Sequence, residues 1–313
     1  MTLSLTENFI ISAEVAEARR RGTPIVALES TVITHGLPHP KNLTLAQNLE
    51  TEIRSAGVVP ATIAILEGKF HIGLTLEELT RLANLPNPMK ISRRDISFAL
   101  VKNESGGTTV AGTLIAANTV RMRVFATGGI GGVHRNAPFD VSADLLELSR
   151  TPLIVVCTGA KAILDLPATL EYLETMGVPV VGYQTDEFPA FYSVHSGLPV
   201  NIQVTTPEEI VEIARKQWEL GLPGAILVVN PPPGEAALPG EKVNRFIEQA
   251  VGEAELQGIR GAQVTPFLLN RVSELTGGES LRANLALLKS NARLAAQIAK
   301  VLAETEKKHQ VIL

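Results

Sequence analysis

Short apolar runs alternate with amphipathic segments along most of the chain. The runs have the length and the β-branched content that are typical of buried strands. Gly-rich or polar turns follow almost every one of them, as expected where a strand leaves a sheet. The predicted strands are 25–30 (IVALES), 62–68 (TIAILEG), 89–92 (MKIS), 123–129 (RVFATGG), 153–159 (LIVVCTG), 179–183 (PVVGY) and 225–231 (AILVVNP).

The segments between these runs carry the 3.6-residue periodicity and the start signals of helices. Residues 43–56 are predicted to form one helix, and Thr75 with Glu78 is a capping-box pair that predicts the start of another. Thr206 with Glu209 predicts a third start of the same kind. Each of these helices lies between two predicted strands, as in a βαβ arrangement.

Two regions depart from this alternation. Residues 65–73 (ILEGKFHIG) are predicted to form a hairpin around Glu67 and Gly68. From residue 242 onward the pattern is helical, interrupted by a loop at 258–263 and by Gly277–Gly278. The whole pattern predicts an α/β protein of one domain, 1–313, with helices on both faces of a mixed, mostly parallel sheet.

Composition excludes several classes of protein. The chain has 313 residues, 45% of them hydrophobic, and a net charge of −4, which offers no basic surface for nucleic acid. Its single cysteine, Cys157, lies within a predicted strand and permits no intrachain disulfide. The N-terminal segment lacks the features of a signal peptide, and no apolar run is long enough to span a membrane. We therefore expect a soluble, cytoplasmic protein.

The sharpest chemical signal is a lysine that follows a buried strand. Lys161 comes directly after the turn Thr158–Ala160, and the helical pattern of Ala162 and Ile163 begins beyond it. We therefore expect Lys161 at a helix N-terminus, where the helix dipole and desolvation would favour the neutral amine. A neutral amine is the nucleophilic form. The alternative is a surface lysine whose stem covers the sheet edge.

A glutamate occupies the equivalent place after the first predicted strand. Glu29 follows the apolar run 25–28 and precedes Ser30 and Thr31. It is interpreted either as a cap of the next turn or as a partly desolvated general acid. In the second case it would serve the amine of Lys161, although their distance in space does not follow from the sequence.

Two further stretches have the composition of anion sites. Residues 106–110 (GGTTV) combine glycines with what we interpret as a helix start, so their amides are predicted to bind a phosphate. Arg93 and Arg94 are candidates for the same role, although adjacent arginines point in different directions. His35 and His39 lie among prolines and are interpreted as loop residues.

The segment 140–145 (DVSADL) places Asp140 and Asp144 four residues apart, with Ser142 as a candidate N-cap between them. Such carboxylates are either helix-start residues favoured by the dipole or ligands of a hard cation. No set of histidines and cysteines has the spacing of a zinc site. A Mg²⁺ or Mn²⁺ ion held by few protein oxygens and several waters is the metal chemistry that this segment allows.

Together these motifs resemble the pseudouridine-5′-phosphate glycosidase family, also called pseudouridylate synthase. The resemblance spans about residues 25–300 and rests on eight blocks that occur here in the family's order. They are ALESTVITHGLPHPKN, KISRRD, GGTTV, TGGIGGVHR, DVSADL, VVCTGAKAILDLPATLEYLET, DEFPAFY and TPFLLNRVSELTGGESLRANLALLKSNA.

The resemblance implies a three-layer α/β/α sandwich, assembled as a homotrimer. It implies reversible cleavage of the C–C glycosidic bond of pseudouridine 5′-phosphate to uracil and ribose 5-phosphate. Lys161 takes the position of the family's covalent nucleophile and Glu29 that of its proton donor. Asp140 takes the position of the metal ligand, with one Mn²⁺ expected per subunit and other divalent cations as alternatives. The implied substrate-binding positions are Lys90, Val110, Ser142, Ala143, Asp144 and Asn284.

The residues considered by themselves are compatible with two other functions. A Schiff-base lyase or aldolase for another sugar phosphate would keep Lys161, Glu29 and the phosphate cradle. A non-catalytic nucleotide sensor or RNA-binding protein is disfavoured, because aromatic residues make up only 4% of the chain and no basic-aromatic stripe is present.

Overall fold

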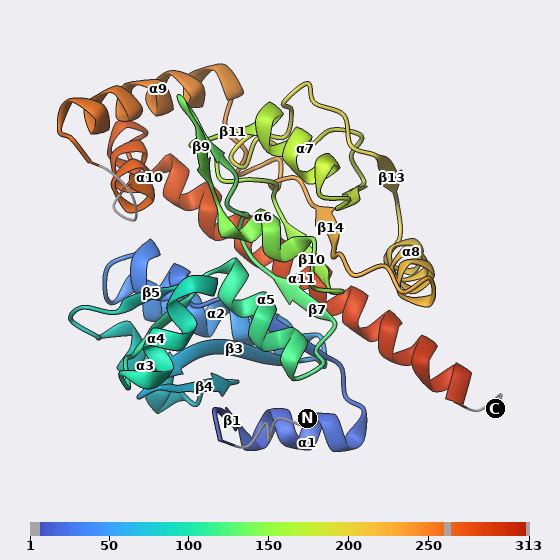
Figure 1. Ribbon diagram of the computed structural model, residues 1–313. Helices are drawn as coiled ribbons and strands as arrows, with labels where there is room; N and C mark the ends of the chain where they lie inside the picture. Colours follow the sequence, from blue (N-terminus) through green and yellow to red (C-terminus); the bar gives the residue numbers. More distant parts are fainter. Residues whose placement is uncertain (1–6, 260–263, 311–313) are drawn as a thin grey trace.

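The predicted strands form the centre of one large sheet (Figure 1). The computed structural model describes residues 7–259 and 264–310. Within them the main sheet has 11 strands, and its longest path runs in the order β1-β4-β3-β2-β7-β10-β14-β12-β13. Off this path, β6 pairs with β3, and β5 pairs with β6. The strands are β1 (Phe9–Ile11), β2 (Ile25–Leu28), β3 (Val59–Leu66), β4 (Lys69–Ile72), β5 (Met89–Ile91), β6 (Gly106–Thr108), β7 (Val124–Ala126), β10 (Ile154–Cys157), β12 (Val180–Tyr183), β13 (Ile202–Val204) and β14 (Ile226–Val229).

The sheet is mixed and mostly parallel, as the sequence predicts. Antiparallel pairing in it is confined to β3, which runs against β4 and β6. The side chains of β10 and β14 are buried along their whole length. This explains why their sequences are continuously apolar, whereas a strand with one exposed face would alternate. A second, three-stranded sheet joins β8 (Val133–His134), β9 (Ala137–Val141) and β11 (Leu164–Asp165).

Helices cover both faces of the main sheet, which confirms the expected layered architecture. In Figure 1, α5 and α6 lie in front of the central strands and α11 lies behind them. The helix α11 packs against α2, α8 and the strands β2, β7 and β10. The helices are α1 (Ala13–Arg21), α2 (Lys41–Ser55), α3 (Leu76–Ala83), α4 (Ile96–Val101), α5 (Val110–Thr119), α6 (Ala143–Leu148), α7 (Leu166–Thr175), α8 (Pro207–Glu219), α9 (Gly240–Leu256), α10 (Val264–Leu275) and α11 (Glu279–Gln310).

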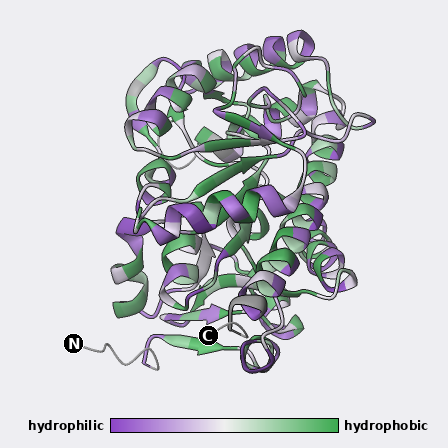
Figure 2. Ribbon diagram, turned by 90° about the vertical axis from the view of Figure 1, so that its right-hand side faces the viewer, coloured by the Kyte–Doolittle hydropathy of each residue, from purple (hydrophilic) through white to green (hydrophobic). Residues whose placement is uncertain are grey.

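Hydropathy follows these layers. Figure 2 shows hydrophobic strands at the centre and helices with hydrophilic and hydrophobic sides around them. The predicted capping boxes are both present, at Thr75 with Glu78 and at Thr206 with Glu209. The predicted hairpin joins β3 to β4, and both turn residues, Glu67 and Gly68, have positive φ angles of 48° and 72°. Such a turn matches the twist of the two strands.

Other sequence expectations are met in part. The helix expected at 43–56 begins two residues earlier, at Lys41, and ends at Ser55. Gly277 and Gly278 separate α10 from α11, as expected. The predicted loop at 258–263 falls mostly outside the described residues. No helix in the described part of the chain has the length and apolar content needed to cross a bilayer.

One buried amide ties the ends of the central strands together. Asn291 of α11 is fully buried. Its Nδ2 donates to the carbonyl oxygen of Thr127 at 2.8 Å and to Oγ1 of Thr158 at 2.9 Å, and its Oδ1 accepts from Nδ2 of Asn230 at 3.0 Å. The three partners are the residues that directly follow β7, β10 and β14. The long helix is therefore fixed to the edge of the sheet where the Gly-rich turns begin.

We predict that Asn291→Ala lowers the free energy of unfolding by about 3 kcal/mol, since buried polar groups that lose their partners cost about 1–3 kcal/mol each. Urea unfolding measures this change. The matched control is Asn84→Ala, which removes an exposed amide that donates to the Thr80 carbonyl oxygen. The control is expected to cost no more than about 0.5 kcal/mol. Equal effects of the two substitutions would contradict the role given to Asn291.

Candidate active site

The carboxylate of Glu29 lies where the order of the sheet reverses. From β2 the chain proceeds to β3 and β4 on one side, and from β7 it proceeds to β10 and the strands beyond it on the other. Glu29 follows β2, is only 7% exposed, and accepts hydrogen bonds from the hydroxyls of Thr127 and Thr31, one on each carboxylate oxygen. Ligands of open α/β sheets bind at such a switch point, beyond the carboxyl ends of the strands.

The turn that carries Lys161 is pinned beside this point. The backbone N–H of Lys161 donates to the carbonyl oxygen of Ile130 at 3.0 Å, and the N–H of Ile130 donates to Gly159 at 3.1 Å. These bonds join the turn after β10 to the turn after β7. Lys161 is half-buried there. The structure thus places Lys161 next to the loop whose first residue, Thr127, binds Glu29.

The expectation that Lys161 begins a helix is wrong. The residues after it form a turn and the short strand β11, and α7 begins only at Leu166. Asp165 is the N-cap of α7, its carboxylate accepting from the N–H of Ala168 at 3.0 Å, and Pro167 occupies the first turn. The helix dipole therefore does not act on Lys161. The sequence Asp-Leu-Pro was the signal for the later start, and pairing of β11 with β8 overrides the helical spacing before it.

A buried aspartate joins the next two pieces of the site. Asp144 is 4% exposed, and its two carboxylate oxygens accept from the backbone N–H groups of Ala111 at 2.9 Å and Gly131 at 2.8 Å. A side chain at position 131 would place its Cβ 2.8 Å from the Asp144 carboxylate and 2.2 Å from Oγ of Ser142. The glycine in the Gly-rich loop is therefore needed for the backbone to reach Asp144.

The GGTTV segment leads into α5 as predicted, but it offers fewer free amides than an anion cradle. Four of the five backbone amides from Thr108 to Gly112, at the end of this segment and the start of α5, already donate to groups of the protein. The amide of Val110, the first residue of α5, has no hydrogen-bond partner in the described part of the chain. The occupied amides are those of Thr108 (to Oγ of Ser30), Thr109 (to the Ile91 carbonyl), Ala111 (to Asp144) and Gly112 (to Oγ1 of Thr109).

Lys90 connects this segment electrostatically with the two carboxylates and with Lys161. It lies on β5, opposite Gly107 of β6. Burial lowers the pKa of Lys90 most, and the positive charge of Lys161 lowers it further, while the charges of Asp144 and Glu29 act in the opposite direction. These charges act on Lys90 because they lie close to it. Four of the predicted site residues therefore share one place in the fold.

Ser142 and Ala143 lie beside Asp144 at the start of α6, and Asn284 lies on α11. Ser142 caps α6, its Oγ accepting from the N–H of Asp144 at 3.2 Å, and Ala143 is the first residue of that helix. Asn284 is half-buried on α11, seven residues before Asn291. Two helical turns separate them, so both lie on the same side of the helix about 10 Å apart.

The two aspartates of DVSADL have different environments. Asp140 lies on β9 and is exposed, whereas both oxygens of Asp144 are bound to backbone amides. The described residues contain no group of three or more histidine, cysteine, aspartate or glutamate side chains that could hold a metal ion. A cation at Asp140 would therefore be held by a single protein carboxylate, and its other ligands would be water or substrate.

The two adjacent arginines, Arg93 and Arg94, also have different environments. Nε of Arg93 pairs with the buried carboxylate of Glu147 at 2.6 Å, so this guanidinium joins two helical segments of the protein. Arg94 is largely exposed and pairs with Asp95 at 3.4 Å. Arg94 is therefore the remaining candidate of the two for a phosphate contact, since Arg93 has a structural partner.

Residues near the site were overlooked in the sequence because their signals are not local. His35 was interpreted as a loop residue, but it lies in a π-helical turn, Val32–Gly36, and its Nδ1 is 2.7 Å from Oγ1 of Thr34. Burial lowers the pKa of His35 most, followed by the charge of Lys90, so His35 borders the site. Thr127 and Asn291 were also missed. A π-helical turn is frequent at functional sites, but only coordinates reveal it.

Comparison with known proteins identifies the family. The family described as "Indigoidine synthase A like protein" matches residues 14–301. A pseudouridine-5′-phosphate glycosidase of Solibacter usitatus is 54% identical over 291 residues, which cover 92% of this chain and 97% of that protein. One of Geobacillus kaustophilus is 52% identical and covers 95% of this chain and 100% of its own. The chain therefore belongs to this enzyme family.

Solved structures agree in fold. An indigoidine synthase A-like protein from Thermotoga maritima has a TM-score of 0.87 at 36% identity, covering 95% of this chain and 97% of its own. The prealnumycin C-glycosynthase AlnA, in complex with ribulose 5-phosphate, has a TM-score of 0.89 at 38% identity, covering 96% of this chain and 99% of its own. Both confirm the α/β architecture over nearly the whole chain.

We predict that Lys161→Met raises the pKa of Lys90, because removal of a neighbouring positive charge makes the protonated amine of Lys90 less costly. The pKa should stay below its ordinary value, since burial is the larger cause of the shift. NMR titration of ¹³C-methylated lysines measures it. Lys69→Met, at an exposed position of β4, is the control and should leave Lys90 unchanged. An unchanged titration of Lys90 in Lys161→Met would show that the two amines are not neighbours.

Proposed function

We propose that this member of the pseudouridine-5′-phosphate glycosidase family reversibly cleaves the C–C glycosidic bond of pseudouridine 5′-phosphate, giving uracil and ribose 5-phosphate. The observation that carries the proposal is the convergence of Glu29, Lys90, Lys161 and Asp144 at the switch point of the sheet. The names of relatives that share more than half of their residues with this chain support it. A C–C bond has no leaving oxygen to protonate, so the paired carboxylates of ordinary glycosidases do not suffice.

The first step that we propose opens the sugar ring. The neutral amine of Lys161 attacks C1 of the ribose, an N–C1 bond forms, and the bond from C1 to the ring oxygen breaks. Glu29 gives its proton to that oxygen, which leaves a carboxylate. The hydroxyls of Thr127 and Thr31 then donate to the two oxygens of this carboxylate and stabilise its charge.

The second step breaks the C–C bond. The Glu29 carboxylate takes a proton from the nitrogen bonded to C1, which frees the electron pair of that nitrogen, and delivers the proton to C5 of uracil. The nitrogen electron pair then forms a C=N bond to C1, and the electron pair of the C1–C5 bond restores the C5=C6 double bond of the base. Water then hydrolyses the imine, which releases ribose 5-phosphate and the free amine of Lys161. The net reaction consumes one water.

The remaining residues would bind and orient the substrate. The cationic side chain of Lys90 and the free amide of Val110 fit an anionic group such as the phosphate. AlnA, which is similar over nearly the whole chain, has been solved with a sugar phosphate, and this supports a phosphate subsite. The proposed substrate contacts are those of Lys90, Val110, Ser142, Ala143, Asp144 and Asn284.

We also propose a divalent metal at Asp140, with Mn²⁺ preferred. Asp140 is exposed and its carboxylate has no ion pair or hydrogen bond in the described residues, so it fits a hard cation that keeps most of its water ligands. Such a cation would supply charge stabilisation for substrate oxygens. The chain's own contribution is a single carboxylate on β9.

For the assembly we propose a homotrimer. Phe139, which precedes Asp140 on β9, is completely exposed in the single chain. A large apolar side chain that projects from a β-ribbon is typical of a surface that contacts another chain. The hairpin of β8 and β9 would then lie between subunits.

A Schiff-base lyase for another sugar phosphate is the second candidate function. It uses the same Lys161 and Glu29, and the ribulose 5-phosphate bound to AlnA shows that a relative of 38% identity accepts a sugar phosphate. Incubation with pseudouridine 5′-phosphate, followed by detection of free uracil, separates the two functions. Turnover of other sugar phosphates without uracil release would favour the lyase.

We predict that Lys161→Arg lowers the turnover rate by roughly 1,000-fold or more. A guanidinium keeps the positive charge but stays protonated, so it cannot attack C1. Borohydride reduction of the wild-type enzyme with ribose 5-phosphate should trap the sugar on Lys161, as peptide mass spectrometry would show. The control Lys102→Arg, at an exposed position, should be fully active. A trapped sugar on Lys90, the amine whose pKa burial lowers, would move the nucleophile to β5.

We predict that chelation removes most of the activity and that added Mn²⁺ restores it. In Asp140→Asn the Mn²⁺ concentration for half-maximal activity should rise by about 10- to 100-fold, since even outer partners of metal ligands have effects of that size. Glu77→Gln, an exposed acid on α3, is the matched control and should titrate like the wild type. Full activity after exhaustive chelation would show that no metal is needed.

A further inference from the structure

We propose that Arg135 is a positioning residue that holds the turn carrying Lys161 in its reactive place, an inference that rests on the proposed function of Lys161. Arg135 follows β8 and is half-buried. Its Nε donates to the carbonyl oxygen of Leu164 at 3.1 Å, and its Nη2 donates to that of Ala162 at 3.1 Å. One planar group therefore spans the residues directly after Lys161.

The two bonds complete a set of tethers on both sides of the lysine. On the sheet side, the N–H of Lys161 donates to Ile130, and on the far side the N–H of Leu164 donates back to Lys161 at 3.0 Å. The strand β11 then pairs with β8, where Leu164 lies opposite His134. Without the guanidinium, the carbonyl oxygens of Ala162 and Leu164 lose their common donor. The turn would then be held only at its beginning and at its short strand.

Arginine is suited to this role by its shape. Its guanidinium presents N–H donors in a rigid fork, so two carbonyl oxygens two residues apart are bound at once. A lysine at the same position has a single ammonium on a flexible stem and cannot fix both oxygens in one geometry. The charge of Arg135 is also compensated locally, since Glu248 and Asp165 favour its protonated form against the effect of burial, which lowers its pKa.

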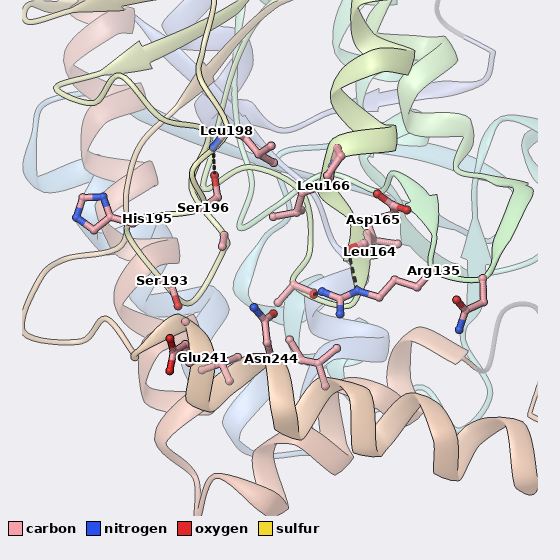
Figure 3. A pocket seen from close by; sticks show the side chains of 17 residues that line it. Arg135, Leu164, Asp165, Leu166, Ser193, His195, Ser196, Leu198, Glu241 and Asn244 are labelled. Atoms are coloured by element: carbon pink, nitrogen blue, oxygen red, sulfur yellow. Dashed lines mark hydrogen bonds between the residues drawn. The ribbon is translucent and has the colours of Figure 1, made fainter.

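A pocket gives access to this guanidinium from outside. It has a volume of about 690 Å³ and is lined by Arg135, Ala162, Leu164, Asp165 and residues of α9 such as Asn244. Figure 3 shows the guanidinium between Leu164 and Asn244, with the bond to Leu164 drawn as a dashed line. Lys161 itself does not line the pocket. A small cation can therefore replace a truncated Arg135 side chain without entering the substrate site.

The kinetic test compares Arg135→Ala and Arg135→Lys with a matched arginine. Arg123 is also half-buried and donates to a carbonyl oxygen, that of Pro152 at 3.0 Å, but it lies before β7, at the opposite end of the strands. We expect kcat to fall about 100-fold in Arg135→Ala, as misplacement by about 1 Å can cause. Arg135→Lys should recover little of this loss, KM should change less than about twofold, and Arg123→Ala should keep the wild-type kcat.

Rescue separates positioning from general damage to the fold. Guanidinium ion at tens of millimolar should restore kcat of Arg135→Ala by about tenfold, whereas equal ionic strength as sodium chloride should not. A loss of activity caused only by a destabilised fold would not recover, because guanidinium weakens folding. Absence of rescue together with a lowered melting temperature would therefore overturn the proposal.

Hydrogen exchange tests the clamp without any substrate. In Arg135→Ala the amides of the segment 161–165 should exchange at least about tenfold faster, while those of β10 keep their protection. Unchanged exchange, or an Arg135→Ala enzyme with wild-type kcat, would overturn the proposal. A wild-type protein that releases no uracil and traps no sugar on Lys161 would instead overturn the proposed function. In that case the exchange measurement still decides whether Arg135 holds the turn.

Discussion

The structure depends on the way one amide satisfies the buried polar ends of three central strands. Where a parallel sheet ends beneath a covering helix, the buried backbone and side-chain polar groups just after the strands have no strand partner, and leaving one of them unbonded is costly. Asn291 offers two donors and an acceptor at that level, and it uses them on Thr127, Thr158 and Asn230. The other buried residues of α11 are apolar except for Ser280 near its start. The same bonds fix the first residues of the turns from which the site is built.

From those turns a continuous chain of hydrogen bonds encloses the site. Thr127 binds Glu29, Ile130 binds the turn of Lys161, and Gly131 binds Asp144. Asp144 in turn holds the start of α5, and Thr108 returns the chain to β2 through Ser30. Most of these bonds use backbone groups, so the positions of the reactive side chains are set by main-chain geometry. Catalytic groups on loops gain in this way the rigidity that regular elements would otherwise provide.

Much of the fold could be predicted from the sequence because its determinants are local. The buried strands, the turn at Glu67–Gly68 and the two capping boxes are set by residues within a few positions of one another. Lys161 shows the limit. Its expected helix start fails because β11 pairs with β8, about 30 residues earlier in the chain, and such pairing leaves no local signal. Asn291 and Thr127 were missed for the same reason, since their partners are distant in sequence.

The charges of the site suggest why two lysines lie together. Asp144 directs both its oxygens at backbone amides, so it compensates the lysines less than its formal charge implies. Burial already disfavours the protonated form of Lys90. In the proposed reaction, a phosphate beside Lys90 would favour its protonated form, because an anion stabilises the charged amine. Repulsion between the two amines, and not the helix dipole that the sequence suggests, is the electrostatic feature that the structure shows beside Lys161.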